Sequence, residues 1–151
     1  MTYASSTTVS PEKSRMEIEQ MLFKFGASEF GVLTKPNSGA VGFVVHGIRI
    51  MIEIPLPSRD SFKEYKDRHG YRKFREPAAQ QREYEQAVRS RWRSLCLLIK
   101  AKMVGIQEGA TTFEVEFLPY MITANGQTFG ERMLPRIAAA RGGGQLLLTA
   151  E

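Results

Sequence analysis

The sequence predicts a single α+β domain. An N-terminal helix, a three-stranded antiparallel meander, a long core helix packed on the sheet and short C-terminal helices are expected to follow one another. Residues 48–56 alternate apolar and polar side chains, as a strand buried on one face does. Residues 77–107 repeat apolar side chains at the period of a helix. At 151 residues the chain is long enough for one domain with a buried core, which we assign to residues 10–141.

The first helix, from Ser10 to Phe25, is predicted by its two ends and by an apolar stripe. Ser10 is a favoured N-cap, and Pro11 suits the first helical position, where no backbone N–H is needed. Gly26 can end the helix in the left-handed conformation. The stripe consists of Ile18, Met21, Leu22 and Phe25. Before this helix, residues 1–9 are rich in Ser and Thr, and we expect them to be disordered.

Three strands joined by tight turns are predicted next. They lie at 29–34, 40–45 and 48–55, with turns at 36–39 and at His46-Gly47. In the third strand, the isoleucines at 48, 50, 52 and 54 share one face, which must cover the core. The other face either meets solvent or forms the floor of a binding site, and it carries Arg49, Met51 and Glu53.

The long helix from Pro77 to Gln107 is predicted to pack on the isoleucine face. Its buried stripe consists of Val88, Trp92, Leu95, Ile99 and Met103. Residues 111–118 alternate like a strand, but a Thr–Glu capping box favours a short helix, which we expect. A strand at 120–123, a turn at 124–126 and a helix at 128–140 complete the domain. Residues 142–151 are expected to form a flexible tail whose apolar end docks on its own domain or on a neighbouring subunit.

The positive charge of the chain is concentrated in one segment. The whole chain has a net charge of +5, whereas residues 59–102 hold 13 basic and 6 acidic side chains, a balance of +7. Such a field favours an anionic partner, most commonly nucleic acid, although basic loops also occur on surfaces that are merely soluble. Residues 59–76 have neither helical nor strand periodicity. We therefore expect a long basic excursion, either a loop or a mobile hairpin around His69-Gly70.

No motif predicts a catalytic, metal or cofactor site, so we expect a protein that is not an enzyme and uses no cofactor. The only cysteine, Cys96, lies in an apolar helical run that is typical of a core. The glycines at 142–144 lack the strand–turn–helix context of a phosphate loop. A single cysteine and the absence of an apolar run of ~20 residues favour a cytoplasmic protein outside the membrane.

The basic excursion interleaves cations with aromatic residues, which suits single-stranded nucleic acid. Cations neutralise phosphates, and exposed aromatic rings stack on bases. The alternative is a loop that wraps the domain and packs its rings inward. Three arginines of the long helix continue the basic surface, because spacings of 7 and 4 residues keep them on one helix face. The predicted nucleic-acid-binding residues are Lys63, Tyr65, Lys66, Arg68, Tyr71, Arg72, Lys73, Phe74, Arg75, Arg82, Arg89 and Arg93.

The order of the elements resembles a family of uncharacterised small proteins of tailed phages and prophages. The resemblance is carried by VSPEKSRMEIEQMLFKFGA at 9–27, RSRWRSLCLLIKAKMVGIQEGATTFEVEFL at 89–118 and NGQTFGERMLPRI at 125–137. Arg132 departs from the pattern, which tends to have an aromatic residue there. The resemblance implies a phage origin and a role either in DNA replication and recombination or in the inhibition of host defence and host enzymes.

Taken together, these features predict a phage-encoded accessory protein of replication or recombination that binds nucleic acid, with single-stranded DNA preferred. The alternative is an anti-defence protein or host inhibitor that binds a host protein or a cyclic nucleotide signal. The expected location is the host cytoplasm. A three-stranded sheet leaves free edges, so we also expect a homo-oligomer, most simply a homodimer that extends the sheet.

Overall fold

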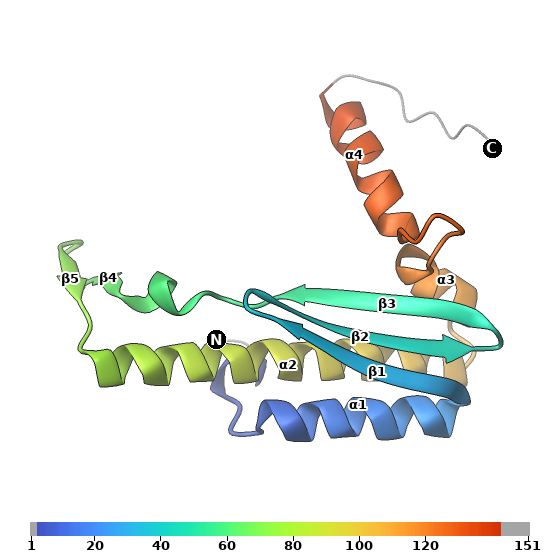
Figure 1. The fold of residues 1–151 in the computed structure, drawn as a ribbon, viewed down its shortest axis with the longest axis horizontal. Coiled ribbons are helices and arrows are strands. Elements are labelled where there is room, and N and C mark those ends of the chain that lie inside the picture. Colours follow the sequence, from blue (N-terminus) through green and yellow to red (C-terminus); the bar gives the residue numbers. More distant parts are fainter. Residues whose placement is uncertain (1–2, 143–151) are drawn as a thin grey trace.

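A three-stranded antiparallel sheet lies on two helices, with the core between them (Figure 1). The computed structural model describes residues 3–142. Its sheet has the order β1-β2-β3, formed by Ala27–Lys35, Ser38–Val45 and Ile48–Pro55. Helix α1 (Pro11–Phe25) and helix α2 (Pro77–Gln107) cover one face of this sheet. This arrangement confirms the predicted α+β fold.

Helix α1 begins and ends where its capping residues predict. The Ser10 Oγ accepts a hydrogen bond from the Lys13 N–H at 3.2 Å, and Pro11 occupies the first turn. Gly26 has a φ of 115°, and its N–H donates to the carbonyls of Leu22 and Phe23. These local interactions supply partners for backbone groups that every helix end leaves open.

The sheet has the register that the isoleucine alternation predicts. Ile50 pairs with Phe43 and Ile52 with Val41, and all four side chains are buried against the helices. Arg49 and Glu53 point to the opposite, outer face, where they are exposed. His46 and Gly47 both have positive φ values, of 50° and 78°, as a two-residue hairpin turn requires.

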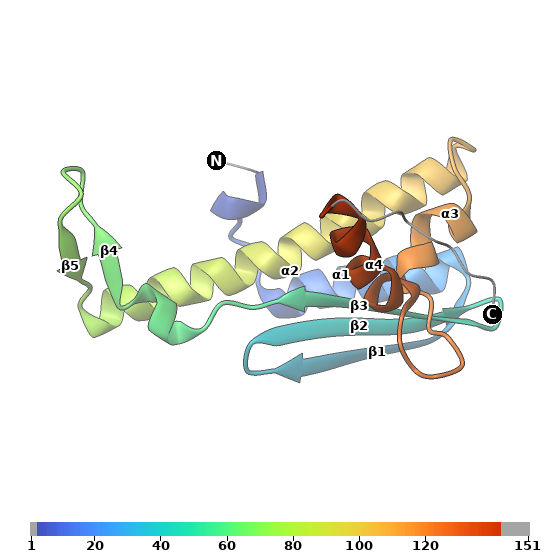
Figure 2. The same ribbon diagram turned by 90° about the horizontal axis from the view of Figure 1, so that it is seen from above.

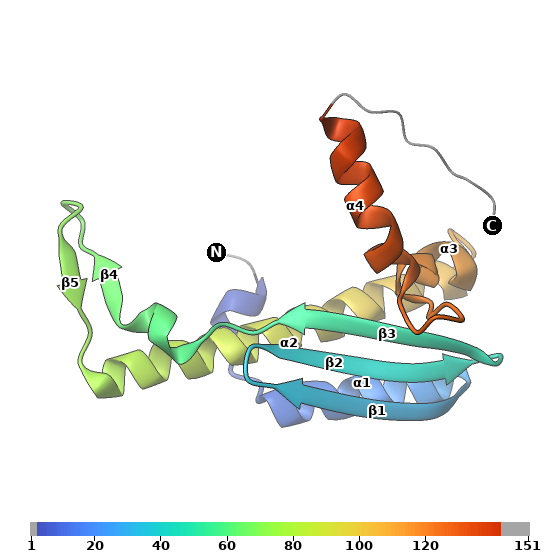
Figure 3. The ribbon, with the colours of Figure 1, turned by 45° about the horizontal axis from the view of Figure 1, so that its top comes forward.

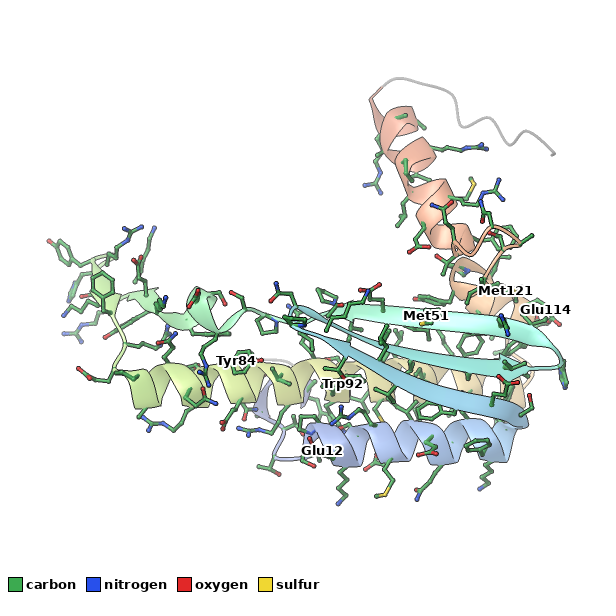
Figure 4. All side chains as sticks on the ribbon, viewed as in Figure 1. Glu12, Met51, Tyr84, Trp92, Glu114 and Met121 are labelled. Carbon is green, nitrogen blue, oxygen red and sulfur yellow. The ribbon has the colours of Figure 1, made fainter. Side chains whose placement is uncertain are left out.

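Helix α2 is longer than the sheet that it supports, so its first half extends beyond the sheet (Figure 1). The buried residues of α2 begin at its midpoint, with Trp92, and continue through its second half with Leu95, Cys96, Ile99 and Met103. The 3-10 turn η2 (Arg59–Phe62) packs on the first half, where the Phe62 and Tyr84 rings lie 6.4 Å apart. In Figure 4, Trp92 lies beneath the sheet and Tyr84 nearer the projecting end.

The expectation of disorder in residues 1–9 is wrong for the part that the structure describes. A 3-10 turn, η1 (Tyr3–Ser6), packs on α2 and buries Ala4. The Gln86 Nε2 donates to the carbonyls of Ser5 and Thr7, at 3.0 and 2.9 Å. A polar segment is ordered here because a distant helix both covers it and satisfies its carbonyls.

The ambiguous segment after α2 is helical, as predicted. Helix α3 (Phe113–Phe117) buries both phenylalanines at its ends, and the Phe117 ring meets Phe43 edge to face at 5.7 Å. The Thr112 Oγ1 caps the helix by accepting from the Val115 N–H. The expected capping box is absent there, because valine stands where Glu would have to reach back.

The strand expected at 120–123 is wrong in extent. The chain first forms a 3-10 turn, η3 (Leu118–Tyr120), and then makes two isolated bridges, Ile50 with Met121 and Ile122 with Thr128. The Ile122 N–H donates to the Arg49 carbonyl at 2.9 Å. These residues therefore cover only one end of the outer edge of β3.

Helix α4 (Phe129–Arg141) confirms the last predicted helix but buries none of its residues. It stands away from the outer face of the sheet (Figure 3). The Thr128 Oγ1 and the Glu131 carboxylate form a reciprocal capping box at its start. Apart from Gly142, the predicted C-terminal tail lies outside the described residues.

Candidate nucleic-acid interface

The basic excursion forms a two-stranded hairpin that projects from the free end of α2. Strand β4 (Glu64–Lys66) pairs antiparallel with β5 (Arg72–Phe74), and we call residues 63–75 the hairpin arm. Figures 1 and 2 show the arm well away from the three-stranded sheet. Of the two predicted forms, a loop or a hairpin, the structure has the hairpin, and its rings are not packed into the domain.

The tip of the arm is held by one side chain. The Asp67 Oδ1 accepts hydrogen bonds from the N–H groups of His69 and Tyr71, at 2.9 and 3.0 Å. The Gly70 N–H donates to the Asp67 carbonyl at 2.9 Å, and Gly70 has a φ of 84°. Aspartate and glycine thus give the arm a defined turn by local chemistry.

The base of the arm is held by Arg75, which was predicted to contact nucleic acid. Its Nη1 donates to the carbonyls of Phe62 and Glu64, both at 3.1 Å. Its guanidinium also lies over the Tyr65 ring, 4.9 Å from the centroid. Because these contacts join the two strands of the arm, the main role of Arg75 is to stabilise the fold of the arm.

Two aromatic rings of the arm are freely exposed. The side chains of Tyr71 and Phe74 are 70% and 74% exposed, whereas Tyr65 is 40% exposed beneath Arg75. The strand register pairs Phe74 with Glu64 and Tyr65 with Lys73, so Phe74 and Tyr65 lie on opposite faces of the arm. The arm therefore offers rings on both faces and near its tip, rather than one continuous platform.

The predicted cations of the arm differ in how they are engaged. Lys63 and Arg72 form exposed ion pairs with Asp60 and Glu64, at 2.8 and 2.9 Å. Lys73 lies 3.6 Å from Asp67, whose side chain is only 19% exposed. Lys66 and Arg68 pair with no carboxylate among residues 3–142, and the Arg68 Nε donates to the His69 Nε2 at 3.0 Å. Exposed pairs contribute little, about 0–1 kcal/mol, so a phosphate can compete for these cations. Nitrogen-bearing side chains surround the arm in Figure 4.

The arginines of α2 do not form one free surface. Arg82 is exposed near the base of the arm. Arg89 is half-buried, and its Nε and Nη2 both donate to the Gln86 Oε1, at 3.1 and 2.7 Å. Gln86 in turn holds the N-terminal segment. Arg89 therefore supports the packing of that segment and is less available than Arg82.

The prediction for Arg93 is corrected by its position. Its Nη1 lies 2.7 Å from the Glu17 Oε2, and only 15% of its side chain is exposed. Helical spacing places Arg93 on the same face of α2 as Arg82 and Arg89. However, α1 packs against α2 at Arg93 and supplies the Glu17 carboxylate. The hydrogen bond from Arg93 lowers the pKa of Glu17. Arg93 thus joins the two helices and lies outside the candidate interface.

Cys96 is part of the same helix–helix contact and not a reactive group. Its Sγ lies 3.6 Å from the Glu17 Oε2 and 3.8 Å from the Arg93 Nη1. Burial raises the pKa of the Cys96 thiol to about 11, so the nucleophilic thiolate is scarce at neutral pH. This agrees with the core position predicted from its apolar run.

Two cations near the arm were missed in the sequence. Arg59 lies over the Tyr84 ring, 5.9 Å from the centroid, and its Nη2 donates to the Gln81 Oε1. Arg91 is exposed beside a shallow depression between η1, Phe62 and α2. Of these two arginines, only Arg59 could have been identified from the sequence, because it stands at the start of the basic segment. Residues 59–91 hold ten basic and six acidic side chains, a net charge of +4.

The described part of the chain shows neither a cluster of metal-ligating side chains nor a helix that could span a membrane. Within residues 3–142, no three His, Cys, Asp or Glu side chains gather closely enough to hold a metal ion. None of the described helices combines the length and apolar character needed to cross a membrane. In comparisons with known proteins, no protein-family model, curated protein or solved structure matches this chain.

Proposed function

We propose that the protein binds nucleic acid without catalysing a reaction, and that the hairpin arm makes the contact. The exposure of Tyr71 and Phe74 carries this proposal. Large rings 70% and 74% exposed contribute little to folding, and here they stand among cations on a narrow projecting hairpin. Proteins that bind single strands use this combination, because bases stack on rings while cations neutralise phosphates.

Single-stranded DNA is the preferred ligand in this proposal. The faces of the bases are hidden in a duplex, whereas a single strand can unstack them onto Tyr71 and Phe74. Arg82, which is exposed on α2, extends the positive field beyond the arm, whereas Arg91 is nine residues further on and therefore lies on the opposite side of the helix. The further role, as an accessory protein of phage replication or recombination in the host cytoplasm, rests on the resemblance in sequence.

The electrostatic part of the proposal is tested with Lys66→Ser and Arg68→Ser together. Neither cation has a carboxylate partner among residues 3–142, so the double variant removes charge without breaking an ion pair. Fluorescence anisotropy with a labelled oligothymidine should show weaker binding. The slope of log K against log salt should fall by about 1.4, from ~0.7 for each lost phosphate contact. Lys13→Ser with Lys24→Ser, on α1, removes the same charge and should leave the slope unchanged.

The aromatic part is tested with Tyr71→Ala and Phe74→Ala. Each should weaken binding by ~1–3 kcal/mol per stacked base and leave the salt slope nearly unchanged, because stacking releases no counterions. Phe23→Ala removes a ring exposed on α1 and serves as the control. A wild-type protein that binds neither oligothymidine nor duplex at low salt would refute the proposal. The alternative partners, a host protein or a cyclic nucleotide, would then be sought by pull-down and calorimetry.

A further inference from the structure

Strand β1 is a free edge of the sheet. It pairs with β2 on one side, and no other described residue between 3 and 142 pairs with its second side (Figure 2). The loop to β2 has only two residues, so Lys35 and Ser38 form a hydrogen-bonded pair. Because such pairs alternate, the backbone N–H and C=O groups of Phe30, Val32 and Thr34 point outward from the edge. An open row of this kind is a template for another strand.

We infer that β1 pairs antiparallel with β1 of a second copy, centred on Val32, to give a two-fold symmetric homodimer with one continuous sheet. In this register Val32 faces Val32, and Phe30 faces Thr34. These are the residues whose backbone groups point outward, so the hydrogen bonds of the ladder can form. A two-fold interface uses the same patch on both copies, which therefore has to complement itself.

The charges of β1 select this register. Glu29 and Lys35 are three residues on either side of Val32, so each Glu29 lies directly opposite Lys35 of the second copy. Both side chains are exposed on the outer face, and no ion pair joins either to another residue in the described part of the chain. A shift of the register in either direction would separate Glu29 from Lys35. Opposite charges directly across two strands stabilise their pairing, whereas like charges destabilise it.

The shapes of the side chains fit the same register. In this register Gly31 faces Leu33 of the second copy. A Cβ added at Gly31 would have no atom of its own chain within 4 Å, so the space next to Gly31 is open. Leu33 is 51% exposed and can occupy that space from the other copy. On the core face, Val32 is 40% exposed and would be covered by its own symmetry mate. Pairing thus buries apolar surface that the single chain leaves in water.

The dimer also has a consequence for the arms, which rests on the proposed function. The two-fold axis through Val32 is normal to the sheet, so the two hairpin arms would lie at opposite ends of the assembly. Two arms on one long strand would bind with avidity. Sedimentation of the protein alone tests the dimer without nucleic acid, so failure of the proposed function leaves this test unaffected.

A charge swap tests the interface. The wild-type chain should sediment as a concentration-dependent dimer. Glu29→Lys should raise the dissociation constant about tenfold or more, because by symmetry it sets two like-charged pairs opposite each other. Lys35→Glu should do the same, and the double variant Glu29→Lys with Lys35→Glu should restore the dimer. Glu53→Lys, on the outer face of β3, is the matched control and should leave association unchanged.

A second variant tests the fit at Gly31. Gly31→Leu should abolish association because its side chain meets Leu33 of the second copy, while the circular dichroism and melting temperature of the monomer stay near wild type, since the site is open. A wild-type chain that stays monomeric at every concentration would overturn the inference. So would a dimer that survives both Glu29→Lys and Gly31→Leu, since that dimer would use another surface.

Discussion

Gly39 lies so close to Trp92 that a single methyl group should disturb the core. A Cβ at Gly39 would lie 2.5 Å from the Trp92 Cζ2 and 3.0 Å from its Cη2. Trp92 is only 2% exposed, and the Arg15 guanidinium lies 5.1 Å from its ring centroid, so the indole has little freedom to move. Carbon atoms in contact are ordinarily ~3.5–4 Å apart. Gly39→Ala must therefore shift the ring or the strand by about 1 Å.

Overpacking of this kind typically costs ~1–3 kcal/mol of unfolding free energy. The cost should come from the clash alone, because Gly39 does not have a positive φ and alanine can adopt its backbone conformation. Replacing Trp92 by leucine removes the ring atoms that clash. In the Trp92→Leu background, Gly39→Ala should therefore cost almost nothing, or stabilise by ~0.4–1 kcal/mol through the unfolded chain.

The assay is a double-mutant cycle measured by urea unfolding and followed by circular dichroism. Fluorescence is unsuitable for the cycle because Trp92 is the only tryptophan, although its emission in the wild-type protein should be that of a buried indole. A coupling energy of ~1 kcal/mol or more is expected between the two positions. Additive effects, or a Gly39→Ala variant as stable as wild type, would show that the ring does not press on β2.

Two further predictions concern the helix contact and the sheet. The pKa of Glu17 is lowered in the folded state by the Arg93 hydrogen bond, so this contribution to stability is present above the ordinary carboxyl pKa of 4.5 and is lost as the pH falls through the lower folded value. Urea midpoints should therefore fall on acidification below about pH 4.5, and fall less in Glu17→Gln than in the exposed control Glu19→Gln; equal declines would contradict the assignment. Ile52→Asp places an unpaired charge in the core and should abolish soluble expression, whereas Glu53→Lys on the outer face should be tolerated. The reverse result would mean that the register of β3 is shifted by one residue.

The hairpin arm illustrates how far the sequence leads toward a site. Its cations and rings were visible as a pattern, and Asp67 with Gly70 accounts for its turn. The pattern did not predict the strand register of the arm, because apolar and polar side chains do not alternate in this segment. As a result, the separation of Tyr65 and Phe74 onto opposite faces could not be foreseen. The same holds for Arg75, whose carbonyl partners lie in η2, at Phe62, and in the other strand of the arm, at Glu64.

The sequence by itself determined the first helix, the three-stranded meander and the long helix, because capping and periodicity are local properties of the chain. Ser10 and Gly26 bound α1, and the alternation around Ile50 and Ile52 set the register of β3. Only the tertiary structure decided which cations remain free. Arg93 has the helical spacing of an exposed arginine, but its partner Glu17 lies 76 residues away in the chain. No local pattern can report such a contact, because it exists only once two helices have packed on the same sheet.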